Sequence, residues 1–221
     1  NGLFLTIGRN LTIEADGQIQ ADYKGYIKLK GPGASVGDAS GGYGGMGSAA
    51  SGATVAGTTY GSASRPVNLG SGGRDNPGAG AVRLTVGGAT TVNGAISASN
   101  PNSINNTCAG SGGSVLLFTG TLGGTGVIRA NGGPGASYAG NSGGGGRVAV
   151  ILSEGTDWGG VQLESRSYVG RASNTGAGGT IYVERPGDTP GQGLLIVDYQ
   201  DVIPGVPSRT FTLQCGTGAS S

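Results

Sequence analysis

The sequence contains no histidine, only two cysteines and few charged residues, which make up 11% of the chain against about 25% in an ordinary soluble domain. The lack of histidine removes the commonest general acid or base. A formal net charge of +1 provides no electrostatic footprint for nucleic acid or for an anionic membrane surface. No run of about 18 apolar residues is present, the length needed to cross a bilayer. We therefore expect no nucleic-acid partner and no membrane insertion.

The two cysteines, Cys108 and Cys215, are far apart, and their spacing matches no zinc-site pattern. In a chain this rich in serine, threonine and glycine, a long-range disulfide is favoured over a metal site, and two unpaired thiols are the alternative. Sequons at Asn10 and Asn105 favour N-glycosylation and an extracellular setting. The sequence thus predicts an extracellular or cell-surface protein without a metal or cofactor.

Glycine is abundant instead, with 51 of 221 residues, about three times its common usage. Short apolar runs follow glycines at a constant spacing of 33 residues, so that Val82 is repeated as Val115. Each run has two alternating aliphatic positions: Val82 and Leu84, Val115 and Leu117, Val148 and Val150, Ile181 and Val183. This alternation of mostly β-branched residues predicts strands, and the glycine and threonine content argues against helices.

A second short strand-like segment follows each run, with a register that drifts by about a residue between copies. A repeat of short strands, tight turns and one glycine-rich excursion predicts one coil of a parallel β-helix, because stacked coils about 4.8 Å apart bury a continuous apolar column. Ankyrin repeats share the period but need helices, and an antiparallel sandwich would not require a fixed register. We predict an all-β fold, a parallel β-helix (β-solenoid) with about 33-residue coils and long glycine-rich loops.

The chain is expected to form a single β-helix domain. Its predicted parts are an N-terminal coil or strand (1–30), a glycine-rich insertion (31–80), regular coils (81–185) and C-terminal strands that form a cap or an assembly segment (186–221). The insertion is too long for an ordinary loop. Its scattered Tyr43, Met46 and Tyr60 favour an ordered meander against the strands over a disordered linker.

Two stretches of the insertion have features of ligand sites. Residues 41–48, GGYGGMGS, resemble a phosphate loop but lack its lysine and its strand-to-helix context. Asp75 and Asn76 lie in a single glycine-rich stretch, whereas calcium-binding nonapeptides occur in tandem copies. Structural glycine is therefore the preferred interpretation.

The blocks 60–62 (YGS), 69–73 (LGSGG) and 80–84 (GAVRL) resemble the glycine-rich repeat regions of very large secreted or surface-anchored proteins of bacteria, algae and other protists. The resemblance covers about residues 41–150. It implies a β-helix-like fold and an extracellular structural or adhesive role, and it implies no catalytic residues. Residues 186–221 depart from the pattern, which leaves their role open.

An enzyme that acts on acidic polysaccharides would need clustered carboxylates, and the 12 carboxylates of this chain are spread thinly. Glu154 and Asp157 lie beside the only tryptophan, Trp158, and are candidates for a sugar contact, with a polar turn under an aromatic cover as the alternative. An ice-binding face is disfavoured because its column would read Thr, Phe, Ile and Glu. We predict no enzymatic activity and no catalytic residues.

Apolar residues also fall on the outer side of the runs, at Leu116, Ala149 and Tyr182, beside Phe118 and Ile151. A monomer seldom leaves such a patch bare, so either the glycine-rich insertion or a neighbouring chain should cover it.

Both chain ends alternate apolar with other residues and lie outside the register of the four runs. The candidate assembly residues are Leu3, Leu5 and Ile7 at one end and Phe211 and Leu213 at the other. Open strand edges pair with another chain or need caps, and head-to-tail contacts that do not close produce filaments. We expect a structural protein that self-associates into a surface filament or adhesive layer. The alternative is a carbohydrate-binding or polysaccharide-acting β-helix domain with glycans as partners.

Overall fold

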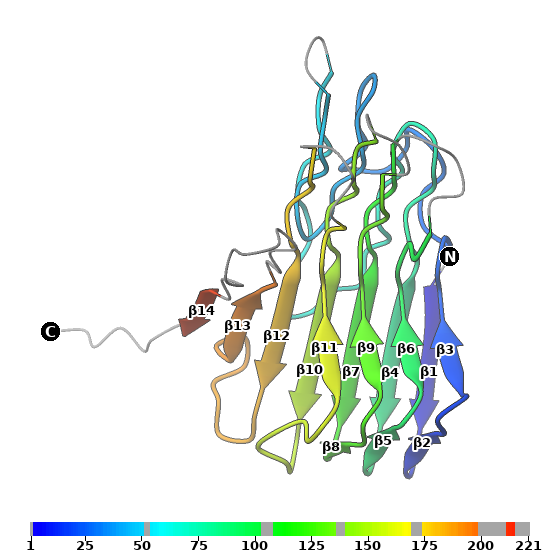
Figure 1. Ribbon diagram of the computed structural model, residues 1–221. Coiled ribbons are helices and arrows are strands. Elements are labelled where there is room, and N and C mark those ends of the chain that lie inside the picture. The colour runs from blue at the N-terminus through cyan, green and yellow to red at the C-terminus, as the bar shows by residue number, and fades with distance from the viewer. Residues whose placement is uncertain are drawn as a thin grey trace, which may run out of the picture.

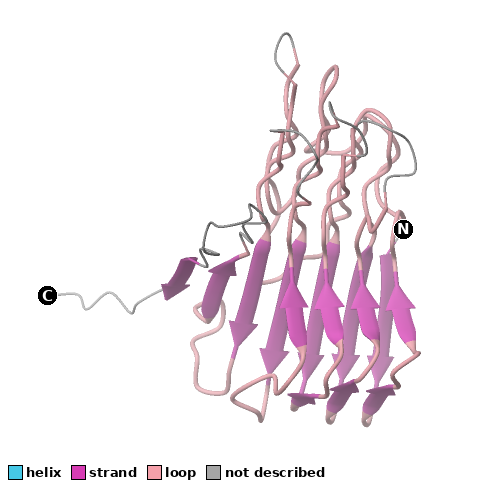
Figure 2. Ribbon diagram, viewed as in Figure 1, coloured by secondary structure: helices cyan, strands magenta, loops and turns pink. Residues whose placement is uncertain are grey.

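Strands and extended segments make up the molecule, and the described part of the chain contains no helix (Figure 2). The computed structural model describes residues 2–50, 54–102, 108–135, 140–168 and 174–198, and the backbone of 211–214. The strands form three sheets, of seven, four and three strands, in one half of the molecule (Figure 1). Glycine-rich segments without strands fill most of the other half.

The longest strands build the seven-stranded sheet. Across that sheet the order is β1 (Gly2–Ile7), β4 (Ala81–Val86), β7 (Ser114–Thr119), β10 (Arg147–Leu152), β12 (Thr180–Glu184), β13 (Leu194–Val197) and β14 (Phe211–Gln214). The four-stranded sheet has the order β11 (Gln162–Glu164), β9 (Val127–Arg129), β6 (Ala95–Ser97) and β3 (Gln18–Gln20). The three-stranded sheet has the order β2 (Leu11–Ile13), β5 (Thr90–Val92) and β8 (Leu122–Gly123).

The register of the 33-residue repeat is confirmed. Val115 of β7 pairs with Val82 of β4 on one side and with Val148 of β10 on the other, and Val148 pairs with Ile181 of β12, all in parallel strands. The eight aligned aliphatic residues of these runs are at most 4% exposed. The alternating positions therefore point inward, as the sequence predicts.

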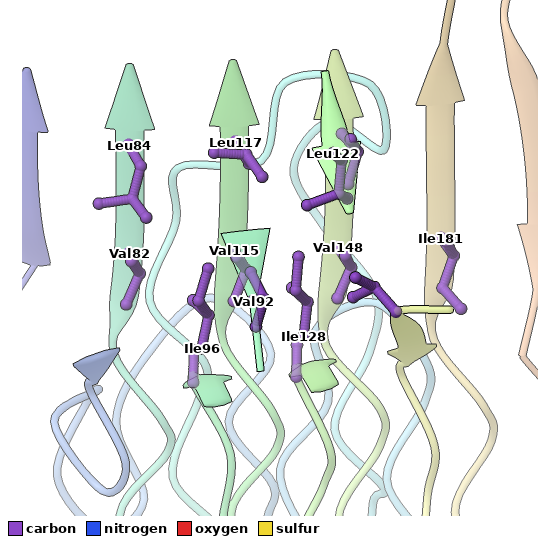
Figure 3. Packing of buried hydrophobic residues seen from close by; sticks show 14 of the residues in the cluster. Val82, Leu84, Val92, Ile96, Val115, Leu117, Leu122, Ile128, Val148 and Ile181 are labelled. Atoms are coloured by element: carbon purple, nitrogen blue, oxygen red, sulfur yellow. The ribbon is translucent and has the colours of Figure 1, made fainter. Parts of the chain in front are cut away.

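The core lies between the sheets. Figure 3 shows Val82, Leu84 and their repeats on the seven-stranded sheet meeting Val92 and Leu122 of the three-stranded sheet and Ile96 and Ile128 of the four-stranded sheet. Aliphatic side chains recur at the same positions from strand to strand, so each repeat buries its apolar residues against its neighbours.

The prediction of a parallel β-helix is wrong. Three separate parallel sheets lie side by side, and the seven-stranded sheet ends with β13 and β14, which run antiparallel. The spacing of the apolar runs specifies which strands are neighbours, but it does not determine how the residues between the strands are arranged. Successive glycines such as 143–146 carry no side chains that could extend an apolar wall, and they form no strand.

Main-chain contacts hold the glycine-rich half together. Backbone hydrogen bonds link consecutive repeats there, from Ala79 N to Ser111 O (3.0 Å), from Gly112 N to Gly144 O (3.0 Å) and from Gly145 N to Ala177 O (3.0 Å). The segments approach so closely that a Cβ atom at Gly113 would overlap the carbonyl oxygen of Gly80. Glycine is required here because backbone packs directly on backbone, as it does at the crowded axis of collagen.

The glycine-rich insertion is an ordered meander over its described residues, 31–50 and 54–80. It crosses several repeats: the amide of Gly41 donates to Ala109 O (3.0 Å), that of Gly44 to Gly145 O (3.0 Å), and Met46 O accepts from Ala177 N (2.8 Å). The insertion therefore packs on the glycine runs that precede β7, β10 and β12.

The same insertion covers the outer apolar patch of the seven-stranded sheet. Leu116, Ala149 and Tyr182 are buried in a cluster of their own. Arg65 lies over the ring of Phe118, with 5.6 Å from its guanidinium carbon to the ring centroid, and forms a 2.8 Å ion pair with Glu184. Of the two predicted covers, the insertion is the correct one.

Candidate functional site

A row of polar side chains lies on the outer face of the four-stranded sheet, which is at the front in Figure 1. The middle residue of each of its strands packs against the core, so the following residue points outward. The middle residues are Ile19, Ile96, Ile128 and Leu163, and the outward residues are Gln20, Ser97, Arg129 and Glu164.

The row continues beyond the ends of the strands. Two positions further along the chain, the same side of the sheet carries Asp22, Ser99, Asn131 and Arg166. We use the term polar face for the surface formed by Ser97, Ser99, Arg129, Asn131, Glu164 and Arg166.

Hydrogen bonds order the centre of the polar face. Asn131 donates through Nδ2 to Glu164 Oε2 (2.9 Å), and its Oδ1 accepts from the amide of Arg166 (2.8 Å). The guanidinium of Arg166 lies 3.0 Å from Glu164 Oε1. Because the Glu164 carboxylate is engaged on both oxygens, its charge is compensated within the face.

Arg129 is held by one end only. Its Nε donates to Ser97 Oγ (3.2 Å), and Ser97 in turn donates to Asp22 Oδ1 (2.6 Å). Within the described residues, the two terminal nitrogens of Arg129 have no hydrogen-bond partner. The hydroxyl of Ser97 thus fixes the side chain while the fork of the guanidinium stays available.

A buried carboxylate lies behind Arg166. Asp198 Oδ2 accepts from the amide of Ser165 (2.6 Å) and lies 4.0 Å from Arg166 Nε. Desolvation by burial raises the pKa of Asp198, and the Ser165 amide and Arg166 oppose that shift. Nε of Arg166 is buried and finds no hydrogen-bond partner in the described part of the chain.

Two hollows open on this side of the molecule and share Arg129. One has a volume of about 340 Å³ and is lined by Ser99, Pro101, Arg129, Asn131, Glu164, Arg166, Ser167 and Tyr168. The other, of about 380 Å³, runs over the turns beside β3, β6, β9 and β11, with Gln18, Asn93, Thr125 and Gln162 among its lining residues. Together they form a shallow, polar surface that crosses several strands.

No family model, curated protein or solved structure matches the chain. The function of the polar face is therefore inferred from its geometry alone.

None of the described residues belongs to a helix that could cross a membrane. Among the same residues, no group of three or more histidine, cysteine, aspartate or glutamate side chains is placed to hold a metal ion. With Glu164 already paired, the arrangement favours binding over acid–base chemistry.

The structure separates the members of the predicted sugar corner. Trp158 is half-buried and packs against the core, whereas Glu154 and Asp157 are exposed. Asp157 Oδ1 accepts from the amide of Gly159 (2.9 Å), so this carboxylate stabilises its own turn. This is the geometry of the alternative, an aromatic cover over a polar turn, and a sugar contact at these residues stays a prediction.

The predicted modification sites are only partly described. Asn10 is exposed, and its Oδ1 accepts from the amide of Ala89 (3.0 Å), while Asn105 lies outside the described residues. Cys108 is buried and forms no disulfide within the described part of the chain. Cys215 lies outside that part, so glycosylation and the disulfide both stay predictions.

The chain ends are more integrated than the sequence indicates. Leu3 and Leu5 of β1 are in register with Val82 and Leu84 of β4, and Ile7 packs against the core. The expectation that this segment lies outside the register is wrong, because the insertion merely lengthens the first repeat. β14, which contains Phe211 and Leu213, pairs antiparallel with β13.

Sequence reasoning missed the polar face. Ser97, Arg129 and Glu164 recur at intervals of 32 and 35 residues around a drifting register, and they share no chemical type. Only their position in the sequence could have identified them, because each follows the buried aliphatic residue of the second strand-like segment.

Proposed function

We propose that this chain is an extracellular structural protein that serves as a building block of a surface filament or adhesive layer and assembles through the edges of its seven-stranded sheet. One observation carries the proposal: β1 and β14 form opposite ends of the same sheet. Among the described strands, each of these two has a partner on one side only. A second copy that places its β14 beside β1 would continue the sheet head to tail, and such contacts produce a filament when the rotation between copies does not close a ring.

The edge of β1 is unprotected. Natural edge strands are blunted by charges, prolines or bulges, and the sequence from Gly2 to Ile7 has none of the three. Phe4 and Leu5 are 59% and 42% exposed. The other sheets begin at the same end with β3 and β2, and Ile7, Leu11 and Ile19, which pack against the core there, are only partly buried.

The energies are compatible with assembly but not with a very tight dimer. Burial of Phe4 and Leu5 contributes about 1.5–3 kcal/mol each, and each edge hydrogen bond about 1 kcal/mol. The loss of translational and rotational freedom costs about 4–15 kcal/mol. Pairing at β1 alone is therefore marginal, and we expect assembly to depend on protein concentration.

Proline at Thr6 tests the proposal. The amide of Gly87 donates to Ile7 O (2.8 Å), so Ile7 faces β4 with its backbone groups. Because these groups alternate along a strand, Thr6 directs its N–H towards the open edge. Thr6→Pro removes an edge donor without removing a bond to β4.

We expect the unsubstituted protein to sediment as oligomers and to form filaments in negative-stain images. Thr6→Pro should remain monomeric with an unchanged circular dichroism spectrum, and Thr6→Ser, which keeps the N–H, should behave like the unsubstituted protein. A monomer at every concentration before substitution, or equal polymerisation after Thr6→Pro, would refute the assembly.

Carbohydrate binding is a second candidate function. It is supported by the polar face, where hydroxyl, amide and guanidinium groups line two adjoining hollows on a regular scaffold. This arrangement agrees with the general form of ligand sites, in which a few placed polar groups fix the ligand.

A further inference from the structure

We infer that the polar face binds an acidic polysaccharide, with the carboxylate of a uronic acid unit held by Arg129. This inference rests on the carbohydrate-binding candidate above and adds the charge of the ligand, the residue that reads it and the direction of the bound chain.

The unused fork of Arg129 is the first argument. Its Nε is occupied by Ser97 Oγ, and the described part of the chain offers no partner to either terminal nitrogen. A guanidinium presents two parallel N–H groups that match the two oxygens of a carboxylate, and such bidentate pairs are among the stronger hydrogen-bonded contacts in proteins. The free groups of Arg129 therefore fit a planar anion.

Local charge is the second argument. Glu164, the carboxylate in the same hollow, pairs with Arg166 at 3.0 Å and accepts from Asn131, and the second carboxylate near that guanidinium, Asp198, is buried behind it. Asp22 reaches Arg129 only through the hydroxyl of Ser97. Arg129 is thus the cation of the face whose charge no contacting carboxylate compensates.

The surroundings of Arg129 supply contacts for the rest of a sugar chain. Tyr168, which is 49% exposed, lines the same hollow and offers a ring face and a hydroxyl. Ser99, Asn131 and Ser167 also line this hollow and offer polar groups to sugar hydroxyls.

The two hollows set the direction of the ligand. Arg129 lines both, and the second hollow is bordered by neutral amides and a hydroxyl, including Gln18, Asn93 and Gln162. Gln18 and Gln162 begin β3 and β11, and Asn93 lies in the turn before β6, so this hollow is at the amino ends of the strands. Ser99, Asn131 and Arg166 of the first hollow follow the carboxyl ends of β6, β9 and β11. A chain that occupies both hollows would therefore run along the strands, with its charged unit at Arg129 and its hydroxyls against the amides.

Binding of a matched pair of oligosaccharides tests the inference. The probes are a hexuronic acid oligomer and the neutral hexose oligomer of the same linkage and length, which differ only in the carboxylate. Titration calorimetry is carried out with the unsubstituted protein, with Arg129→Gln and with Arg83→Gln. Arg83 lies on the opposite side of the molecule, over Phe118, so its substitution removes the same charge away from the face.

We expect the uronic acid oligomer to bind at least 10-fold more tightly than the neutral one, at the scale of one charge-assisted pair. Arg129→Gln should abolish that preference, Arg129→Lys should restore part of it, and Arg83→Gln should leave it intact. Thermal melts of each variant verify folding.

The outcomes distinguish carbohydrate binding by the polar face from recognition of the carboxylate by Arg129. Equal binding of both oligomers would overturn the role of Arg129 while supporting carbohydrate binding. No binding of either oligomer would overturn both. A preference that Arg83→Gln weakens as much as Arg129→Gln would assign the effect to overall charge and refute the site.

Discussion

Replacement of Gly113 by alanine tests whether direct backbone packing, and not chain flexibility, explains the glycine content. A Cβ atom at Gly113 would lie 2.8 Å from the carbonyl oxygen of Ala79 and closer still to that of Gly80. Both neighbours are main-chain atoms, so neither can rotate away as a side chain would. The segment itself must shift.

That shift disturbs two hydrogen bonds, from Gly113 N to Ala98 O (2.9 Å) and from Ser114 N to Gly80 O (3.1 Å). Their loss costs about 1 kcal/mol each, and overpacking adds about 1–3 kcal/mol, so we expect a loss of about 3–5 kcal/mol. For a chain of this size, 1 kcal/mol lowers the melting temperature by about 2–4 °C, so Gly113→Ala should melt at least about 6 °C lower.

Gly8→Ala is the matched control, because an added Cβ at Gly8 meets nothing within 4 Å. Both substitutions reduce the entropy of the unfolded chain by a similar amount, so their difference isolates the clash. Urea unfolding followed by the fluorescence of Trp158 and by circular dichroism measures the two free energies. Agreement between the variants to within about 0.5 kcal/mol would show that close packing does not account for the glycine at this position.

Two further substitutions probe the core and the ion pair. Val115→Asp should leave no folded protein by circular dichroism, because it buries an unpaired charge, whereas Val67→Asp at an exposed position should fold; a folded Val115→Asp protein would refute the core assignment. Burial alone would raise the pKa of Glu184, but hydrogen bonds from Arg65, the Gly191 amide and Tyr182 outweigh it and lower that pKa. Glu184 then contributes stability above its unfolded pKa and loses it as the pH falls through the lowered value, so Glu184→Gln should lose less stability on acidification than the unsubstituted protein. Equal acid dependence in melts from neutral to acidic pH would contradict this.

The inward register could be predicted from the sequence because burial selects residue type directly. Val82, Val115, Val148 and Ile181 must all be aliphatic to share one column, so their spacing is visible without a structure. The grouping of strands into three sheets could not be predicted in the same way. It depends on where the backbone turns, and turns tolerate many residues.

The candidate site escaped prediction for a related reason. Outward positions such as Ser97, Arg129 and Glu164 lie on the side of the strands away from the apolar core, where no hydrophobic packing requirement makes them alike. Trp158 is the reverse case: its sequence neighbours Glu154 and Asp157 suggest a sugar-binding site, but its side chain has a packing role. It packs against the core, in a segment that runs beside β8, the last strand of the three-stranded sheet.

The path of the glycine-rich insertion has a consequence for how the molecule unfolds. In an array whose repeats contact only their neighbours, the ends can open one repeat at a time. Here one segment bonds to three successive repeats, at Ser111, Gly145 and Ala177. Opening any of these repeats also removes contacts of the insertion, which binds the other two repeats. We therefore expect the repeats to unfold together rather than one at a time.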